Sequence, residues 1–78
     1  MPTIFRVGSY RFFFYAGDRN ELVHIHVEKD DNTAKFWLSP IRMYRSKGFK
    51  RTELGYMRKI IEEKQEEIIR FWNEYFSD

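Results

Sequence analysis

The spacing of apolar residues changes once along this chain, and that change limits the folds it can adopt. Before residue 40, apolar and polar residues alternate in short runs, as at Val23, Ile25 and Val27, which is typical of half-buried strands. From Arg51 onward the period is helical. The apolar positions there, spaced three, four, seven, four and three residues apart, are Leu54, Met57, Ile61, Ile68, Trp72 and Tyr75. The sequence therefore predicts a sheet followed by one long amphipathic helix.

Segments rich in Gly, Pro, Asn and Asp divide the first part of the chain into four predicted strands. These strands are Ile4–Val7, Arg11–Tyr15, Leu22–Glu28 and Ala34–Leu38. We expect an α+β fold in which a four-stranded antiparallel meander sheet packs one face against the long C-terminal helix. A chain of 78 residues has room for a single domain. Its expected parts are the sheet (1–40), a basic connection (41–50) and the helix (51–77).

Charge is distributed unevenly along the chain. Residues 1–40 carry five basic and five acidic side chains, residues 41–59 carry seven basic and one acidic, and residues 60–78 carry two basic and six acidic. The helix therefore begins among basic residues and ends among acidic ones, the reverse of what the helix dipole favours. Basic side chains beside free helix amides favour an anion such as phosphate. We expect nucleic-acid or anion binding at Arg42, Arg45, Lys47, Lys50 and Arg51; the alternative is a set of solvated loop cations.

His24 and His26 are the only histidines, and their spacing on a strand directs both side chains to one face, with Glu28 next in the same row. Such a row suits acid and base catalysis of phosphodiester cleavage, and His24, His26 and Glu28 are the candidate catalytic residues. A purely structural role in packing and hydrogen bonding is the alternative. Because ligands spaced along one strand rarely converge on an ion, we expect no metal and no cofactor.

Composition excludes several classes of protein. The chain has no cysteine, which excludes disulfides, iron–sulfur clusters and thiolate zinc sites. It has no Gly-rich phosphate loop and no apolar run long enough to span a bilayer, so we expect a cytoplasmic protein without membrane contact. Eight Phe, five Tyr and two Trp in a chain this short favour self-association as a homodimer.

Four runs of the sequence, taken in order, resemble the bacterial domain-of-unknown-function family DUF4160. They are Met1–Gly8, Tyr10–Tyr15, His24–Glu28 and Ala34–Leu38. Members of that family typically carry a Pro-Pro-His-Val-His-Val run whose histidines correspond to His24 and His26. Here Leu22-Val23 stands in place of the two prolines, and Lys50 stands where a Ser or Asn helix cap is usual. The resemblance implies a neighbouring gene for a second small protein, in an arrangement similar to a toxin–antitoxin pair.

Two functions stay open at this point. The first is a toxin that acts on RNA, with His24 and His26 as acid and base, Glu28 orienting them, and the basic stretch holding phosphate. The second is a non-enzymatic antitoxin or a regulator that binds nucleic acid or protein through the basic stretch before the helix. The expected partners are a cognate small protein, RNA or DNA, and a second copy of the chain.

Overall fold

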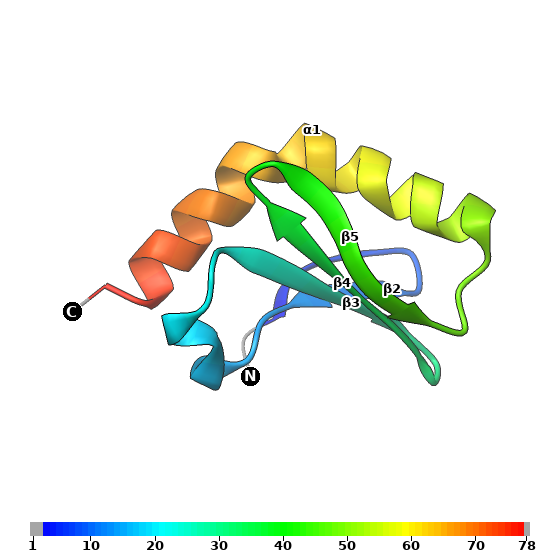
Figure 1. Cartoon of the computed structure of the whole chain (residues 1–78), viewed down its shortest axis with the longest axis horizontal. Helices are drawn as coiled ribbons and strands as arrows, with labels where there is room; N and C mark the ends of the chain where they lie inside the picture. Colours follow the sequence, from blue (N-terminus) through cyan, green and yellow to red (C-terminus); the bar gives the residue numbers. More distant parts are fainter. Residues whose placement is uncertain (1–2, 78) are drawn as a thin grey trace.

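The computed structural model describes residues 3–77 and shows one sheet crossed by one long helix (Figure 1). Met1, Pro2 and Asp78, which belong to the motifs and charges considered above, lie outside the described residues. The elements are β1 (Thr3–Val7), β2 (Tyr10–Phe13), the short 3₁₀ helix η1 (Ala16–Asn20), β3 (His24–Lys29), β4 (Asn32–Leu38), β5 (Ile41–Lys47) and α1 (Arg51–Tyr75).

The five strands form one antiparallel sheet in the order β1-β2-β3-β4-β5, so every strand pairs with its neighbours in sequence. The predicted α+β class, meander topology and C-terminal helix are confirmed. Asp30 lies in the turn that joins β3 to β4 and adopts a positive φ of 56°, which aspartate tolerates better than most residues.

The sheet has a fifth strand where the sequence predicted a basic connection over residues 41–50. β5 pairs with β4 along its length, from Leu38 opposite Ile41 to Thr33 opposite Lys47. The alternation of Ile41, Arg42 and Met43 is strand-like, but a bulge between the pairs at Lys35 and Phe36 interrupts it at Tyr44. The interruption and the basic composition explain why this strand was not predicted.

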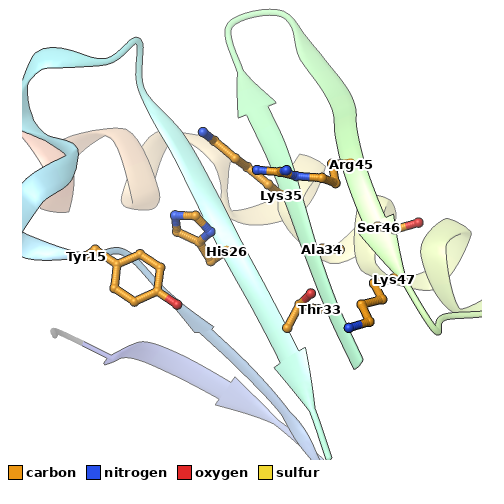
Figure 2. Close-up of a pocket in the computed structure, with 8 residues that line it drawn as sticks. All are labelled: Tyr15, His26, Thr33, Ala34, Lys35, Arg45, Ser46 and Lys47. Atoms are coloured by element: carbon orange, nitrogen blue, oxygen red, sulfur yellow. The ribbon is translucent and has the colours of Figure 1, made fainter. Parts of the chain in front are cut away.

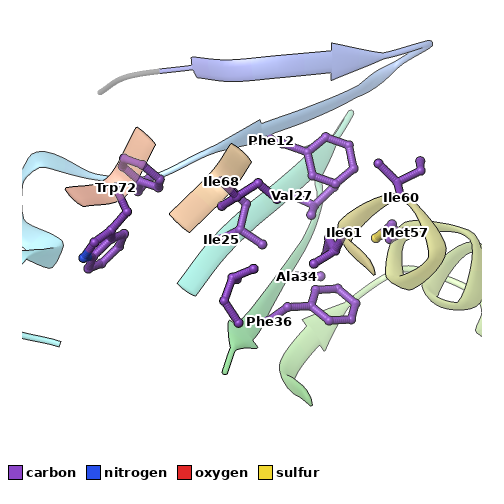
Figure 3. Close-up of a cluster of buried hydrophobic side chains, with 12 residues drawn as sticks. Phe12, Ile25, Val27, Ala34, Phe36, Met57, Ile60, Ile61, Ile68 and Trp72 are labelled. Carbon is purple, nitrogen blue, oxygen red and sulfur yellow. The ribbon is translucent and has the colours of Figure 1, made fainter. Parts of the chain in front are cut away.

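α1 covers one face of the sheet, and the hydrophobic core lies between them (Figure 3). The predicted helical stripe is confirmed at Met57, Ile61, Ile68 and Trp72, which are buried, while Tyr75 at its end is 43% exposed. Gln65, halfway along the helix, donates a hydrogen bond to the Leu38 carbonyl at 2.5 Å and ties α1 to the end of β4. The sheet contributes Phe12, Ile25, Val27, Ala34, Phe36 and Leu38 to this core.

α1 does not cover the opposite face of the sheet, which we call the open face; among residues 3–77 only the short η1 contacts one end of it, through Asp18 and His26. Because side chains alternate along strands, the residues between the core positions point to this face. It carries Arg11, Phe13, His26, Lys35 and Trp37. No helix within residues 3–77 combines the length and the apolar character needed to cross a membrane.

Replacing Gly48 and Gly55 by alanine should change the stability of the fold in opposite directions. Gly48 has a φ of 89°, and a Cβ there would collide with the Asn32 side chain, whereas Gly55 lies in α1 with open space around its Cβ position. We expect Gly48→Ala to lower the free energy of unfolding by about 1–3 kcal/mol. Gly55→Ala should raise it by about 0.4–1 kcal/mol. Urea denaturation of both variants checks the pair, and equal effects would contradict the backbone described here.

Candidate functional site

Strand register places three nitrogen-bearing side chains in one row on the open face. His26 of β3 lies opposite Lys35 of β4, and Lys35 lies opposite Arg45 of β5. Residues that face each other across neighbouring strands share one side of the sheet. The fifth strand therefore brings part of the basic stretch beside the histidine strand.

A pocket of about 350 Å³ opens on this row (Figure 2). The pocket, which we call the basic pocket, is lined by Tyr15, His26, Thr33, Ala34, Lys35, Arg45, Ser46 and Lys47. Figure 2 shows Lys35 and Arg45 extending over the same face and Lys47 directed toward Thr33. No carboxylate lines the pocket, so its lining is suited to an anion.

The cations of the basic pocket differ in how far they are neutralised. Lys35 pairs with Glu21 at 2.7 Å, and this hydrogen bond lowers the pKa of the Glu21 carboxyl. Arg45 and Lys47 have no carboxylate partner among the described residues, and both are exposed. These two side chains therefore carry the free positive charge of the pocket.

Behind His26 lies a buried cluster that joins η1 to β3. Asp18 of η1 is 7% exposed, and its Oδ2 atom accepts hydrogen bonds from the Tyr15 amide at 2.9 Å and from His26 Nε2 at 3.1 Å. The ring of His26 also stacks on Phe13 and meets Tyr15 edge to face. Burial lowers the pKa of His26 and outweighs the opposing effect of the Asp18 carboxylate, so the ring is neutral at neutral pH.

His24 lies deeper than His26, with no exposed side-chain surface. Its Nδ1 atom is 2.7 Å from the Leu22 carbonyl oxygen, which only accepts hydrogen bonds, so Nδ1 carries the proton. Its Nε2 atom is 3.0 Å from Asp18 Oδ2, yet the direction does not form a hydrogen bond, and this nitrogen has no hydrogen-bond partner among the described residues. Asp18, His24 and His26 together are the group that could hold a metal ion, with ligand atoms within 4.8 Å of one another.

The structure separates Glu28 from His24 and His26, although its spacing on the strand placed it in their row. Its carboxylate binds Arg11, with Glu28 Oε1 at 2.7 Å from Nε and 2.6 Å from a terminal nitrogen. Arg11 in turn lies over the Phe13 ring, 3.9 Å from its centroid. The carboxylate that touches both histidines is Asp18 instead.

The five residues that were predicted to bind an anion do not lie at one site. Arg45 and Lys47 line the basic pocket, whereas Arg42 lines a separate pocket of about 490 Å³ beside Trp37. Lys50 and Arg51 lie at the start of α1, outside the residues that line either pocket.

The start of α1 is already complemented by a carboxylate of the chain itself. Glu53 accepts hydrogen bonds from the Lys50 amide at 3.0 Å and from the Tyr10 hydroxyl at 2.9 Å, and Lys29 lies 3.7 Å away. These contacts, the Lys50 amide first, hold the pKa of Glu53 below its ordinary value of 4.5. Glu53 therefore places a negative charge of the chain itself at the helix N-terminus, beside the residues predicted to bind an anion.

The lowered pKa of Glu53 predicts a pH dependence of stability. Because the unfolded chain takes up this proton at higher pH than the folded one, the stabilisation is present above 4.5 and is lost as the pH falls through the lowered value. We expect Glu53→Gln, which keeps an acceptor for the Tyr10 hydroxyl, to lose less stability than the wild type between about pH 7 and pH 3. Urea midpoints at both pH values measure this difference, and parallel losses would refute it.

Asp18, Lys35 and Tyr15 are among the site residues that sequence reasoning missed. Asp18 lies in a segment rich in turn-forming residues, where Asp is favoured for backbone reasons. Nothing in the sequence therefore indicates that Asp18 contacts the histidines. Lys35 and Tyr15 were assigned to strands without a function. One wall of the pocket comes from β5, and because that strand was not predicted, the pocket was not predicted either.

Comparison with known proteins identifies a family to which the chain is similar. A family model described as "Domain of unknown function (DUF4160)" matches residues 9–73, which include the histidine strand, the basic pocket and most of α1. No curated protein and no solved structure matches the chain. The matched range covers most of the 78 residues, and the chain therefore belongs to the DUF4160 family.

Proposed function

We propose that the open face of the sheet binds the phosphates of single-stranded RNA, and that the chain is the RNA-directed component of a two-gene bacterial module. The observation that carries this proposal is the basic pocket, where, within residues 3–77, Arg45 and Lys47 have no carboxylate partner and no acidic residue lines the walls. An anion entering the pocket meets unneutralised cations.

The donors around the pocket match the needs of a phosphate group. The Arg45 guanidinium is a planar fork that can donate two hydrogen bonds to one phosphate, and Lys47 adds a point charge beside it. Thr33 and Tyr15 add hydroxyl donors from β4 and from the segment after β2. Such contacts depend on charge rather than on base sequence, which supports binding that varies steeply with salt.

Aromatic side chains near the pocket favour a single strand over a duplex. Tyr44 is 54% exposed and meets Trp37 edge to face, with ring centroids 5.2 Å apart, and Tyr15 is 46% exposed on the opposite side of the row. Exposed rings on a sheet stack on bases that are not held in a helix. The same face therefore offers both phosphate contacts and stacking surfaces.

Fluorescence anisotropy with a short labelled RNA tests the proposal. The wild-type chain should bind single-stranded RNA at low salt, bind the corresponding RNA duplex more weakly, and lose affinity as salt is raised. A single-stranded DNA of the same sequence shows whether the 2′-hydroxyl contributes. Absence of binding at low salt, or equal binding to single strand and duplex, would count against the proposed face.

A second candidate, RNA cleavage by a toxin, is favoured by one further observation. His26 lines the basic pocket and is hydrogen-bonded to Asp18, so an imidazole lies beside the proposed phosphate position. His24, fully buried, does not line the pocket and would act only through Asp18.

Expression in bacteria distinguishes the toxin from a binding module. A toxin that acts through His26 should arrest growth and fragment RNA, and His26→Gln should abolish both while its circular dichroism matches the wild type. Growth without arrest in either strain would exclude an autonomous toxin and leave the binding module, an antitoxin or a regulator, with its cognate small protein as the next partner to identify.

A further inference from the structure

We propose that Asp18, His24 and His26 bind a divalent first-row transition metal ion, with zinc as the first candidate. A bound ion would link η1 to β3, behind the basic pocket. This inference rests on the buried cluster alone and does not depend on RNA binding.

The donor set selects the class of metal. Two imidazoles and one carboxylate suit zinc, cobalt, nickel and ferrous iron, whereas magnesium and calcium prefer oxygen ligands alone. Asp18 Oδ2 lies 3.0 Å from His24 Nε2 and 3.1 Å from His26 Nε2. Separations of about 3 Å are those expected between neighbouring ligands whose bonds to one ion are about 2.0–2.2 Å long.

The unpartnered nitrogen of His24 is the observation that points to an ion. With the proton on Nδ1, Nε2 presents a lone pair, and a carboxylate oxygen that is also an acceptor lies 3.0 Å from this nitrogen. Two acceptors at 3.0 Å repel each other unless a cation lies between them. A proton on Nε2 would not serve, because the direction from this nitrogen to Asp18 fails as a hydrogen bond. A metal ion bound to both atoms, lying off the line that joins them, would resolve the conflict.

The surroundings of the cluster resemble those of a metal site. The Leu22 carbonyl accepts the Nδ1 proton of His24, the outer contact that fixes the tautomer and orientation of metal-binding histidines. Trp72 and Trp37 contact the His24 ring, with centroids 5.0 Å and 5.6 Å away, and shield it from water. A dry surrounding strengthens the attraction between a cation and its ligands.

Metal binding requires a small inward movement of the His26 side chain. Bonds of about 2.0–2.2 Å allow no two ligand atoms to lie more than roughly 4.4 Å apart, and the three atoms now lie within 4.8 Å of one another. His26, the most exposed of the three side chains at 17%, can turn inward and give up the proton that it donates to Asp18. Its exposed edge is also the path by which an ion enters.

Cobalt and zinc titrations of the purified chain test the site. Co²⁺ quenches fluorescence at close range, so we expect it to quench the two tryptophans beside His24 and EDTA to restore their emission. Zn²⁺ should raise the melting temperature by at least about 4 °C. Asp18→Asn, which still accepts the Tyr15 amide, and His26→Gln should each weaken Co²⁺ binding more than about tenfold.

Glu28→Gln is the matched control, because Glu28 continues the histidine row but binds Arg11 instead. It should bind Co²⁺ as the wild type does. Quenching that is equal in the wild type and in folded Asp18→Asn, or no quenching at all, would overturn the metal site. RNA binding measured in EDTA is independent of this result, so failure of one proposal leaves the other standing.

Discussion

Reversing the charges of Arg45 and Lys47 together is expected to lower the affinity for single-stranded RNA at least about 100-fold. Each side chain would donate a charge-assisted hydrogen bond worth about 1.5–3 kcal/mol, and about 1.4 kcal/mol corresponds to a tenfold change in affinity. The Arg45→Glu/Lys47→Glu variant measured by fluorescence anisotropy gives the loss. Alanine at both positions should make the slope of log affinity against log salt shallower by about 1.4, because each single-strand phosphate contact contributes about 0.7.

A second double variant controls for net charge. Lys59 and Arg70 lie exposed on α1, on the other side of the molecule from the open face. Lys59→Glu/Arg70→Glu makes the same change in net charge as the pocket variant. It should retain affinity within about threefold once salt is near 150 mM, because distant exposed charges are screened there. Similar losses of affinity in the two variants would mean that RNA binding depends on the overall charge of the protein rather than on the basic pocket.

Changing Phe14 to alanine should produce the largest loss of stability of any substitution considered. Phe14 has no exposed surface and lies between the end of β2 and the last turns of α1, with its ring centroid 5.0 Å from Trp72 and 5.6 Å from Phe76. Removing a buried phenyl ring lowers the free energy of unfolding by about 3–5 kcal/mol. For a domain of this size the melting temperature should fall by at least about 12 °C.

Phe71→Ala is the matched control for this substitution. Phe71 meets the same Phe14 ring, at 5.9 Å between centroids, but is 39% exposed on α1. It should lose less than half as much stability as Phe14→Ala in thermal denaturation followed by circular dichroism. Equal losses would show that the end of α1 is not anchored through Phe14.

The helix and the first strands could be predicted because their apolar periods are regular, and the fifth strand could not. Met57, Ile61 and Ile68 repeat at helical spacing and face the sheet as expected. In β5, the bulge at Tyr44 breaks the alternation after three residues, and Lys and Arg replace apolar residues because this edge strand has a face open to solvent. The strand is held by its pairing with β4, a long-range contact that local composition does not encode.

The candidate site could be predicted only in part, for the same reason. The spacing of His24 and His26 correctly indicated that both rings point to one side of β3. Their carboxylate partner comes from η1 rather than from Glu28, because Asp18 folds back over the strand while Glu28 is held by Arg11. Sequence spacing describes neighbours along a strand well, but it carries no information about which loop closes over it.

The start of α1 shows a second limit of what can be predicted from the sequence. Clustered Lys50 and Arg51 beside free amides indicated an anion site, and an anion is indeed present there, in the form of the Glu53 side chain. Glu53 lies at the third helical position, where a carboxylate reaches back to the amide before the helix. Glu53 thus complements the helix dipole from within the chain, and the pocket lined by Arg45 and Lys47 lies on β5 instead.

Chemical-shift mapping by NMR tests the central claim most directly. A uniformly ¹⁵N-labelled chain is titrated with a short single-stranded RNA, and amide shifts are assigned to the elements of the sheet and helix. The account predicts that the shifts concentrate on the open face, at Thr33, Lys35, Arg45 and Lys47, with little change along α1. Shifts concentrated at Lys50 and Arg51 at the helix start, or no shifts at low salt, would contradict it.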